Sequence, residues 1–168
     1  MRRIAAIAAA AIITASALPG RERKPDWVQE TPGAAWRPRD SQGEFVYRGH
    51  IWILGGWDTP KTPNFLDVWK SKDGKAWKQV TEAAPWVQSD LPVALVFKNR
   101  MWIMGGRKLP GTECSHKVWS SGDGATWTLV TPAAGWSPRL APGFAVFKKR
   151  MWILGGTEDF YNNNDRTV

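Results

Sequence analysis

The chain has 168 residues, of which 43% are hydrophobic and 23% are charged, so it can bury a core and is not an intrinsically disordered protein. Its formal net charge is +8, but the basic residues are spread along the chain, which disfavours a nucleic-acid binder with its clustered basic patch. Twelve tryptophans stand beside two tyrosines and six phenylalanines, and this excess is the most informative feature of the composition.

The N-terminus has the pattern of a secretory signal peptide over residues 1–17. Two arginines follow the first methionine, an apolar stretch covers 4–14, and small residues at 15–17 form a cleavage site. The apolar stretch is too short to span a membrane, so no stable membrane anchor is expected. We therefore expect an exported protein, periplasmic or extracellular, with a linker over 18–26. The alternative is an N-terminal buried or amphipathic helix.

A 50-residue repeat organises the rest of the chain, and internal repeats of this length are typical of propellers and solenoids. Three tryptophan positions and one glycine pair recur at this step without insertion or deletion. They are Trp27, Trp77 and Trp127; Trp36, Trp86 and Trp136; Trp52, Trp102 and Trp152; and the pairs at 55–56, 105–106 and 155–156.

Each full repeat predicts four short strands. In the central copy these are 95–97, 101–104, 118–120 and 127–131. The dipeptide Asp123-Gly124 between the last two is a strong hairpin signal, because glycine tolerates a positive φ and aspartate can bond its own backbone. Four antiparallel strands in about 50 residues match one β-propeller blade.

The order of an apolar first strand, then Met-Trp-Ile-Leu-Gly-Gly at 151–156 and its counterparts, then Val-Trp and a fourth-strand tryptophan resembles the Kelch repeat. This resemblance implies an all-β fold, a Kelch-type β-propeller that is incomplete. The tryptophans and glycines would then build the propeller and do no chemistry, because large flat side chains fill the space between stacked blades. Galactose oxidase shares this fold, but a copper site of its kind needs Tyr, Cys and two His in concert, and no such set can be argued here.

The repeat predicts about two and a half four-stranded blades and a lone N-terminal closing strand. The expected units are a lone strand at 27–36, a blade at 37–86, a blade at 87–136 and a half blade at 137–168. Val168 corresponds to Val118, just before a third-strand tryptophan. A truncated gene, a fragment and a chain that completes its ring by oligomerising all remain open. Open blade edges are expected to favour self-association.

Function is expected in the long connections between strands two and three and between strands four and one, which emerge on one side of a propeller. Loops on a rigid scaffold commonly carry binding residues, and arginine can hold a carboxylate with two parallel bonds. Solvated loop charges are the alternative for each residue. The candidate ligand-binding residues are Arg37, Arg39, Trp57, Asp58, Arg107, Glu113, Arg139, Glu158 and Tyr161.

No catalytic or metal-binding motif stands out. The two histidines, His50 and His116, occupy dissimilar repeat positions, and the single cysteine cannot form an intrachain disulfide. We therefore expect no metal and no cofactor, and a binding scaffold for a glycan or a protein. The alternative is a periplasmic sugar-modifying enzyme, because the chain resembles sialic-acid mutarotases in export and repeat. Its candidate residues would be Arg39, Arg139 and Glu113.

Overall fold

The structure is a computed structural model that describes residues 27–158. The expectations for the signal peptide (1–17), the linker (18–26) and Tyr161 lie outside the described residues. Within the described range the fold is all-β and contains no helix, and hence none that could cross a membrane. The all-β prediction is confirmed.

Ten short strands make up the fold. They are β1 (Gly43–Tyr47), β2 (His50–Leu54), β3 (Val68–Ser71), β4 (Trp77–Thr81), β5 (Val93–Phe97), β6 (Arg100–Met104), β7 (Val118–Ser121), β8 (Trp127–Thr131), β9 (Gly143–Phe147) and β10 (Arg150–Leu154).

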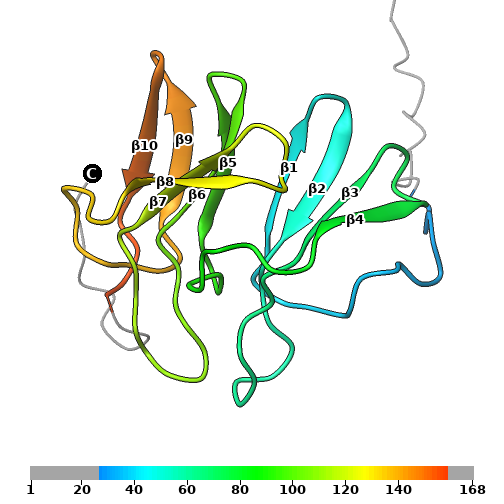
Figure 1. The fold of residues 1–168 in the computed structure, drawn as a ribbon, viewed down its shortest axis with the longest axis horizontal. Coiled ribbons are helices and arrows are strands. Elements are labelled where there is room, and N and C mark those ends of the chain that lie inside the picture. Colours follow the sequence, from blue (N-terminus) through cyan, green and yellow to red (C-terminus); the bar gives the residue numbers. More distant parts are fainter. Residues whose placement is uncertain (1–26, 159–168) are drawn as a thin grey trace, which may run out of the picture.

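The strands form two four-stranded antiparallel sheets and one hairpin, none of them closed. Sheet 1 has the order β1-β2-β3-β4, sheet 2 has the order β5-β6-β7-β8, and hairpin 3 pairs β9 with β10. Figure 1 shows them side by side in sequence order, with sheet 1 on the right and hairpin 3 on the left. Consecutive antiparallel sheets of four strands are compatible with the blades of a β-propeller.

The two sheets repeat in detail, including the hairpin before the fourth strand. In sheet 2, Asp123 Oδ1 accepts hydrogen bonds from the backbone N–H groups of Ala125 (2.9 Å) and Thr126 (2.8 Å). These bonds, that of Thr126 foremost, stabilise the charged carboxylate and lower the pKa of Asp123 below its usual value. Asp73 makes the same bonds in sheet 1 and its pKa is lowered too, chiefly by the backbone N–H of Ala76.

The main core lies between sheets 1 and 2. Trp52 and Leu54 of sheet 1 pack in one buried cluster with Met101 and Ile103 of sheet 2. Burying each such side chain contributes about 1.5–3 kcal/mol, so this contact is the principal source of stability. The hydroxyl of Tyr47 adds a bond across the junction, to the carbonyl of Asn99 at 2.8 Å. A smaller cluster lies between sheet 2 and hairpin 3.

Backbone hydrogen bonds join neighbouring units at the same 50-residue step. The second glycine of the first two pairs donates to a carbonyl of the next unit: Gly56 N–H to Ser89 at 2.8 Å, and Gly106 N–H to Arg139 at 2.8 Å. A second bond runs the other way. Leu91 N–H donates to the carbonyl of Ser41 at 3.1 Å, and Ala141 N–H donates to that of Leu91 at 3.0 Å.

The second glycine of the pair is required because its Cα lies close to the backbone that leads into the first strand of its own unit. Gly56 has a φ of +85°, and a Cβ there would lie 2.6 Å from the carbonyl oxygen of Asp40. Gly106 has a φ of +84°, and a Cβ there would lie 2.7 Å from the carbonyl oxygen of Gln88. Any other residue would be strained and would collide with backbone, which explains why the pair recurs in every repeat.

The expected lone strand at 27–36 is wrong. These residues form no strand, and the first bridge of the chain joins Asp40 to Trp57. Trp27, which aligns with the fourth-strand Trp77, is 90% exposed. A fourth strand is held by a third strand beside it, and no described strand lies at that place. The sequence pattern of a strand therefore remains without its hydrogen-bonding partner.

Candidate functional site

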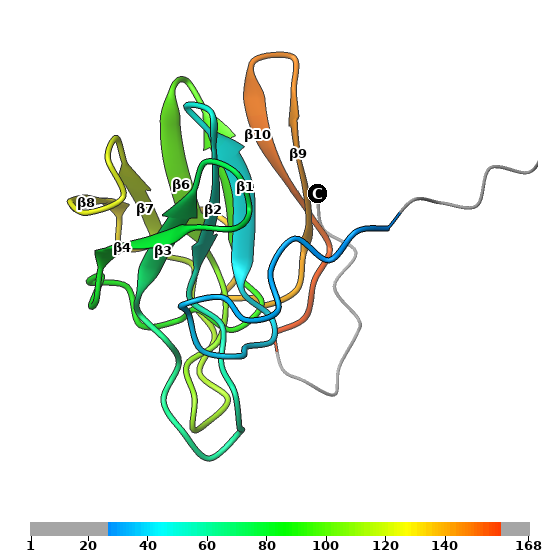
Figure 2. The ribbon, with the colours of Figure 1, turned by 90° about the vertical axis from the view of Figure 1, so that its right-hand side faces the viewer.

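The long connections gather at one end of the sheets, as the repeat predicts. The loops 57–66 and 107–116 lie at the bottom of Figure 1, opposite the tight turns of β1–β2, β5–β6 and β9–β10. Figure 2, turned by 90°, shows the same separation. These two loops and the segment that leads into β1 hold most of the predicted site residues.

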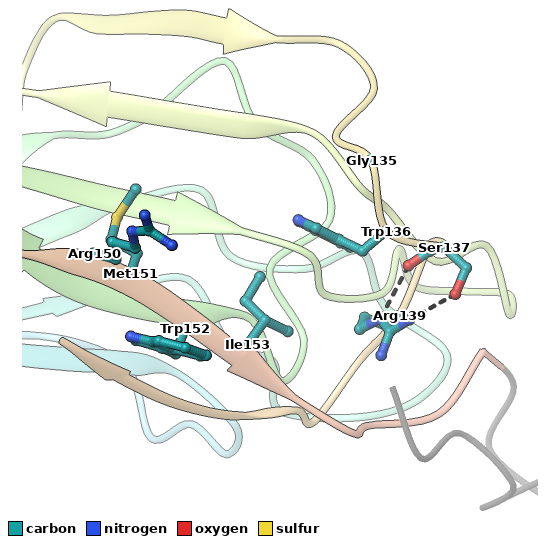
Figure 3. A pocket seen from close by; sticks show the side chains of 8 residues that line it. All are labelled: Gly135, Trp136, Ser137, Arg139, Arg150, Met151, Trp152 and Ile153. Carbon is teal, nitrogen blue, oxygen red and sulfur yellow. Dashed lines mark hydrogen bonds between the residues drawn. The ribbon is translucent and has the colours of Figure 1, made fainter. Parts of the chain in front are cut away.

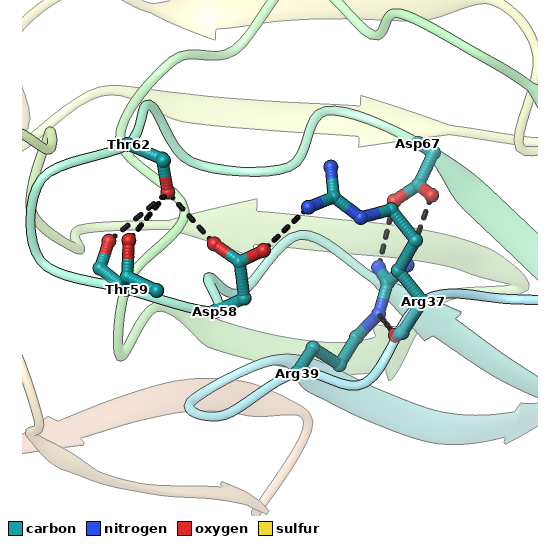
Figure 4. A network of polar contacts seen from close by, with 6 residues as sticks. All are labelled: Arg37, Arg39, Asp58, Thr59, Thr62 and Asp67. Atoms are coloured by element: carbon teal, nitrogen blue, oxygen red, sulfur yellow. Dashed lines mark hydrogen bonds and ion pairs between the residues drawn. The ribbon is translucent and has the colours of Figure 1, made fainter.

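A polar network braces the loop after β2 (Figure 4). Arg37 forms an ion pair with Asp58 at 2.5 Å, and the other carboxylate oxygen of Asp58 accepts the hydroxyl of Thr62 at 2.7 Å. The hydrogen bond from Thr62, followed by the positive charge of Arg37, lowers the pKa of Asp58 below its usual value. The sequence prediction that named Arg37 and Asp58 therefore brought together two residues that are in contact.

Arg39 lies behind this network, and its guanidinium is held by several hydrogen bonds. Its guanidinium forms a two-bond ion pair with Asp67, at 2.7 and 2.9 Å, and donates to the carbonyl of Gly55 at 2.9 Å. Only 1% of its side chain is exposed. Asp67 also accepts the indole N–H of Trp69 at 2.7 Å, so one carboxylate fixes both a guanidinium and an indole ring.

A groove of about 490 Å³ lies beside this arrangement, between residues 35–37 and the strands β3 and β4. Two aromatic rings and several hydrogen-bonding side chains line it. The residues that matter here are Arg37, Phe65, Asp67, Trp69, Gln79 and Glu82. Trp69 and Phe65 are half-buried, whereas Arg37, Gln79 and Glu82 are exposed.

Arg107 lies inside the protein, where the two long loops meet. Its guanidinium contacts Asp90 at 2.8 Å through Nε and at 2.6 Å through the terminal nitrogen, and Asp90 is 1% exposed. The side chain of Asn64, from the neighbouring loop, donates to the carbonyl of Arg107 at 3.0 Å and accepts the N–H of Leu109 at 2.5 Å. The contact between the two loops was not visible from the sequence, because Asn64 has no repeat counterpart of its kind.

Arg139 repeats the position of Arg39 and is also buried. It donates to the carbonyl of Gly155 at 2.6 Å, just as Arg39 donates to Gly55. It also donates to the hydroxyl of Ser137 at 2.7 Å, as Figure 3 shows. It lines a pocket of about 530 Å³ together with Trp136. Both arginines thus anchor the segment before a first strand to the glycine pair of the same unit.

The remaining predicted residues are dispersed. Trp57 is half-buried and pairs its backbone with Asp40, while its indole N–H has no partner among the described residues. Glu113 and Glu158 are exposed, and the carbonyl of Glu158 accepts the thiol of Cys114 at 3.1 Å. In the part of the chain that the structure describes, no three His, Cys, Asp or Glu side chains are placed to hold a metal ion.

Of the groove residues that matter here, sequence reasoning named Arg37 and missed the others. Trp69 belongs to the Val-Trp pair that marks the third strand of each repeat, and it also lines the groove in sheet 1. Gln79 and Glu82 lie on and after an exposed outer strand and carry no motif. The signal that could have identified Gln79 and Glu82 was a difference between repeats, because Leu129 and Pro132 occupy the same repeat positions in the second unit.

Comparison with protein-family models gives no match for this chain. Comparison with curated proteins gives no significant match either.

Proposed function

We propose that the chain is an exported Kelch-type propeller array that acts as a binding scaffold, and that the groove beside sheet 1 binds a glycan. The Kelch assignment is supported by the 50-residue repeat with its glycine pair and by the stacking of four-stranded units. Export is supported by the signal-peptide pattern over 1–17.

The chemistry of the groove suits a sugar. Sugar rings offer an apolar C–H face to an aromatic ring and hydroxyl groups to amides, carboxylates and guanidinium groups. The groove supplies Trp69 and Phe65 for the first and Gln79, Glu82 and Arg37 for the second. Its volume of about 490 Å³ lies within the range of about 300–1,000 Å³ that is typical of ligand pockets.

The observation that carries the proposal is the fixed orientation of Trp69. Its indole N–H donates to Asp67 at 2.7 Å, and Asp67 is itself held by the two bonds from Arg39. A ring that is already immobilised loses little conformational entropy when a ligand stacks on it, so more of the contact energy appears as affinity.

The alternative enzyme gains no support from its two nominated arginines. The guanidinium of Arg39 is bonded to Asp67 and to a backbone carbonyl, and that of Arg139 is bonded to Ser137 and to the carbonyl of Gly155. Both side chains anchor the backbone of their own unit, and an arginine held in this way is poorly placed to grip the carboxylate of a substrate.

The test is a titration of the exported chain with a panel of neutral and acidic oligosaccharides, followed through the indole N–H signals in NMR spectra. We expect the Trp69 signal to shift and Trp69→Ala to weaken binding at least about tenfold, which corresponds to about 1.4 kcal/mol. Lys78→Ala, at an exposed position of the neighbouring strand β4, is the control and should leave the affinity unchanged. Saccharide binding that survives Trp69→Ala, or binding of proteins but of no saccharide, would refute the proposal.

A further inference from the structure

The two ends of the described array carry complementary backbone groups. Gly156 follows hairpin 3, and its N–H repeats the donor that Gly56 and Gly106 use across the existing junctions. This N–H has no acceptor among the described residues. At the other end, the carbonyl of Arg39 occupies the position of the acceptors in those junctions and receives no bond from a described residue.

The second bond of the junction is left open in the same way. Ser41 N–H corresponds to the N–H of Leu91, which donates to the preceding unit, but Ser41 has no described acceptor. Ala141 offers the matching carbonyl at the far end of the array, again without a described donor. The end of the array at hairpin 3 therefore has one donor and one acceptor without described partners. The end at sheet 1 has the matching acceptor and donor at the same spacing along the sequence.

The side chains on the outer face of hairpin 3 match those that sheet 1 buries against sheet 2. Trp152 and Leu154 occupy the repeat positions of Trp52 and Leu54, which are 3% and 0% exposed. Leu154 is 41% exposed, and Phe147, in the position of Tyr47, is exposed as well. We call this surface the tail face.

The outer face of sheet 1 matches the side of sheet 2 that receives sheet 1. Val46, Ile51 and Ile53 occupy the positions of Val96, Met101 and Ile103, which all pack against the core between the sheets. Val46 is 68% exposed and Ile51 is 41% exposed, whereas Ile53 is already buried within its own chain at 9%. We call this surface the head face.

The head face also has room for the indole ring of Trp152, which the tail face of a second copy would place there. Trp52 packs on Gly124, where an added Cβ would overlap its ring. Gly74 is the counterpart on the head face, and a Cβ there would meet only Ile51, at 4.0 Å. Glu44 is the one residue of the head face that is charged where sheet 2 has an uncharged residue. It is exposed, whereas Ala94, at the same repeat position of sheet 2, is buried in the existing junction.

We propose that the tail face of one copy docks on the head face of a second copy and so repeats the contact between sheets 1 and 2. Gly156 N–H then donates to the Arg39 carbonyl of the second copy, and the Ser41 N–H of the second copy donates to the Ala141 carbonyl. The two surfaces are different, so the contact is head-to-tail and can build a closed ring or a longer assembly.

The test uses one variant for each face and a mixture of the two, with the exported chain studied by sedimentation velocity. Val46→Asp disables the head face and Leu154→Asp disables the tail face, and both side chains are exposed, so thermal unfolding followed by circular dichroism should still show a folded chain. Leu129→Asp, on the outer edge of sheet 2, is the matched control. We expect the parent and the control to associate and each variant alone to be monomeric.

A one-to-one mixture of the two variants should form a heterodimer, because an intact tail face in one chain then meets an intact head face in the other. A parent chain that stays monomeric, a variant that associates like the parent, or a mixture that stays monomeric would each overturn the proposal. As an independent check, Glu44→Ala recreates the Ala94 position and should lower the dissociation constant. An unchanged or raised constant would contradict the docking geometry.

Discussion

The contact between sheets 1 and 2 can be tested with a pair of glycines that share a backbone conformation but differ in their neighbours. Gly124 has a φ of +81° and Gly74 a φ of +76°, in the same hairpin position of two sheets. Only Gly124 lies against the Trp52 ring of the neighbouring sheet. Alanine at either position therefore introduces the same backbone strain, and at Gly124 it adds a steric clash.

The expected magnitudes follow from these geometries. The left-handed conformation costs an alanine about 1–2 kcal/mol, which is the whole expected effect of Gly74→Ala. Trp52 is buried and its indole donates to the carbonyl of Tyr47 at 3.0 Å, so it cannot turn away freely. The added methyl group at Gly124 should therefore cost about 1–3 kcal/mol more, as overpacking typically does.

The assay is urea unfolding of both variants in the Val46→Asp background, so that association between copies does not contribute to stability. We expect a clearly lower urea midpoint for Gly124→Ala than for Gly74→Ala, with similar dependence on urea. Equal midpoints would refute the packing of Trp52 on Gly124 and with it the stacking of the two sheets.

Three further predictions concern single residues. Trp52→Ala should cost about 3–5 kcal/mol because the ring is buried, whereas Trp152→Ala, at a more exposed repeat position, should cost clearly less in the same urea assay. Arg107→Met should cost about 3–5 kcal/mol in thermal unfolding because it leaves the buried carboxylate of Asp90 without its cation, and a variant as stable as the parent would contradict the pairing. Because the pKa of Asp123 is lowered in the folded chain, its charged carboxylate stabilises the fold in full above the ordinary pKa of 3.8. This stabilisation is lost as the pH falls through the lower folded pKa. The variant Asp123→Asn should therefore lose less stability than the parent between neutral and strongly acidic pH.

The sequence was sufficient for the strands because each signal was local and repeated. The glycine pair, the Asp-Gly turn and the alternating apolar residues predict β5 to β8 and the matching strands of sheet 1 within a few residues. It failed at 27–36, where the pattern around Trp27 has no third strand to pair with. Strand formation depends on a partner that a local pattern cannot reveal.

The site was predicted less well for a physical reason. The ligand-binding role of Arg39, Arg107 and Arg139 stays a prediction. The sequence did not show that each is held by carboxylates or carbonyls that lie 16 to 28 residues away along the chain. The groove depends on Gln79 and Glu82, which are ordinary exposed residues until the fold brings them beside Trp69.

Hydrogen exchange at the glycine pairs offers the most direct test of the repeated junction between units. The N–H groups of Gly56 and Gly106 donate to carbonyls of the next unit, and that of Gly156 has no described acceptor. In the monomeric Val46→Asp variant, NMR-detected exchange should be slow and similar at Gly56 and Gly106 and fast at Gly156. Exchange at Gly56 and Gly106 that is as fast as at Gly156 would show that the units are not joined in this way.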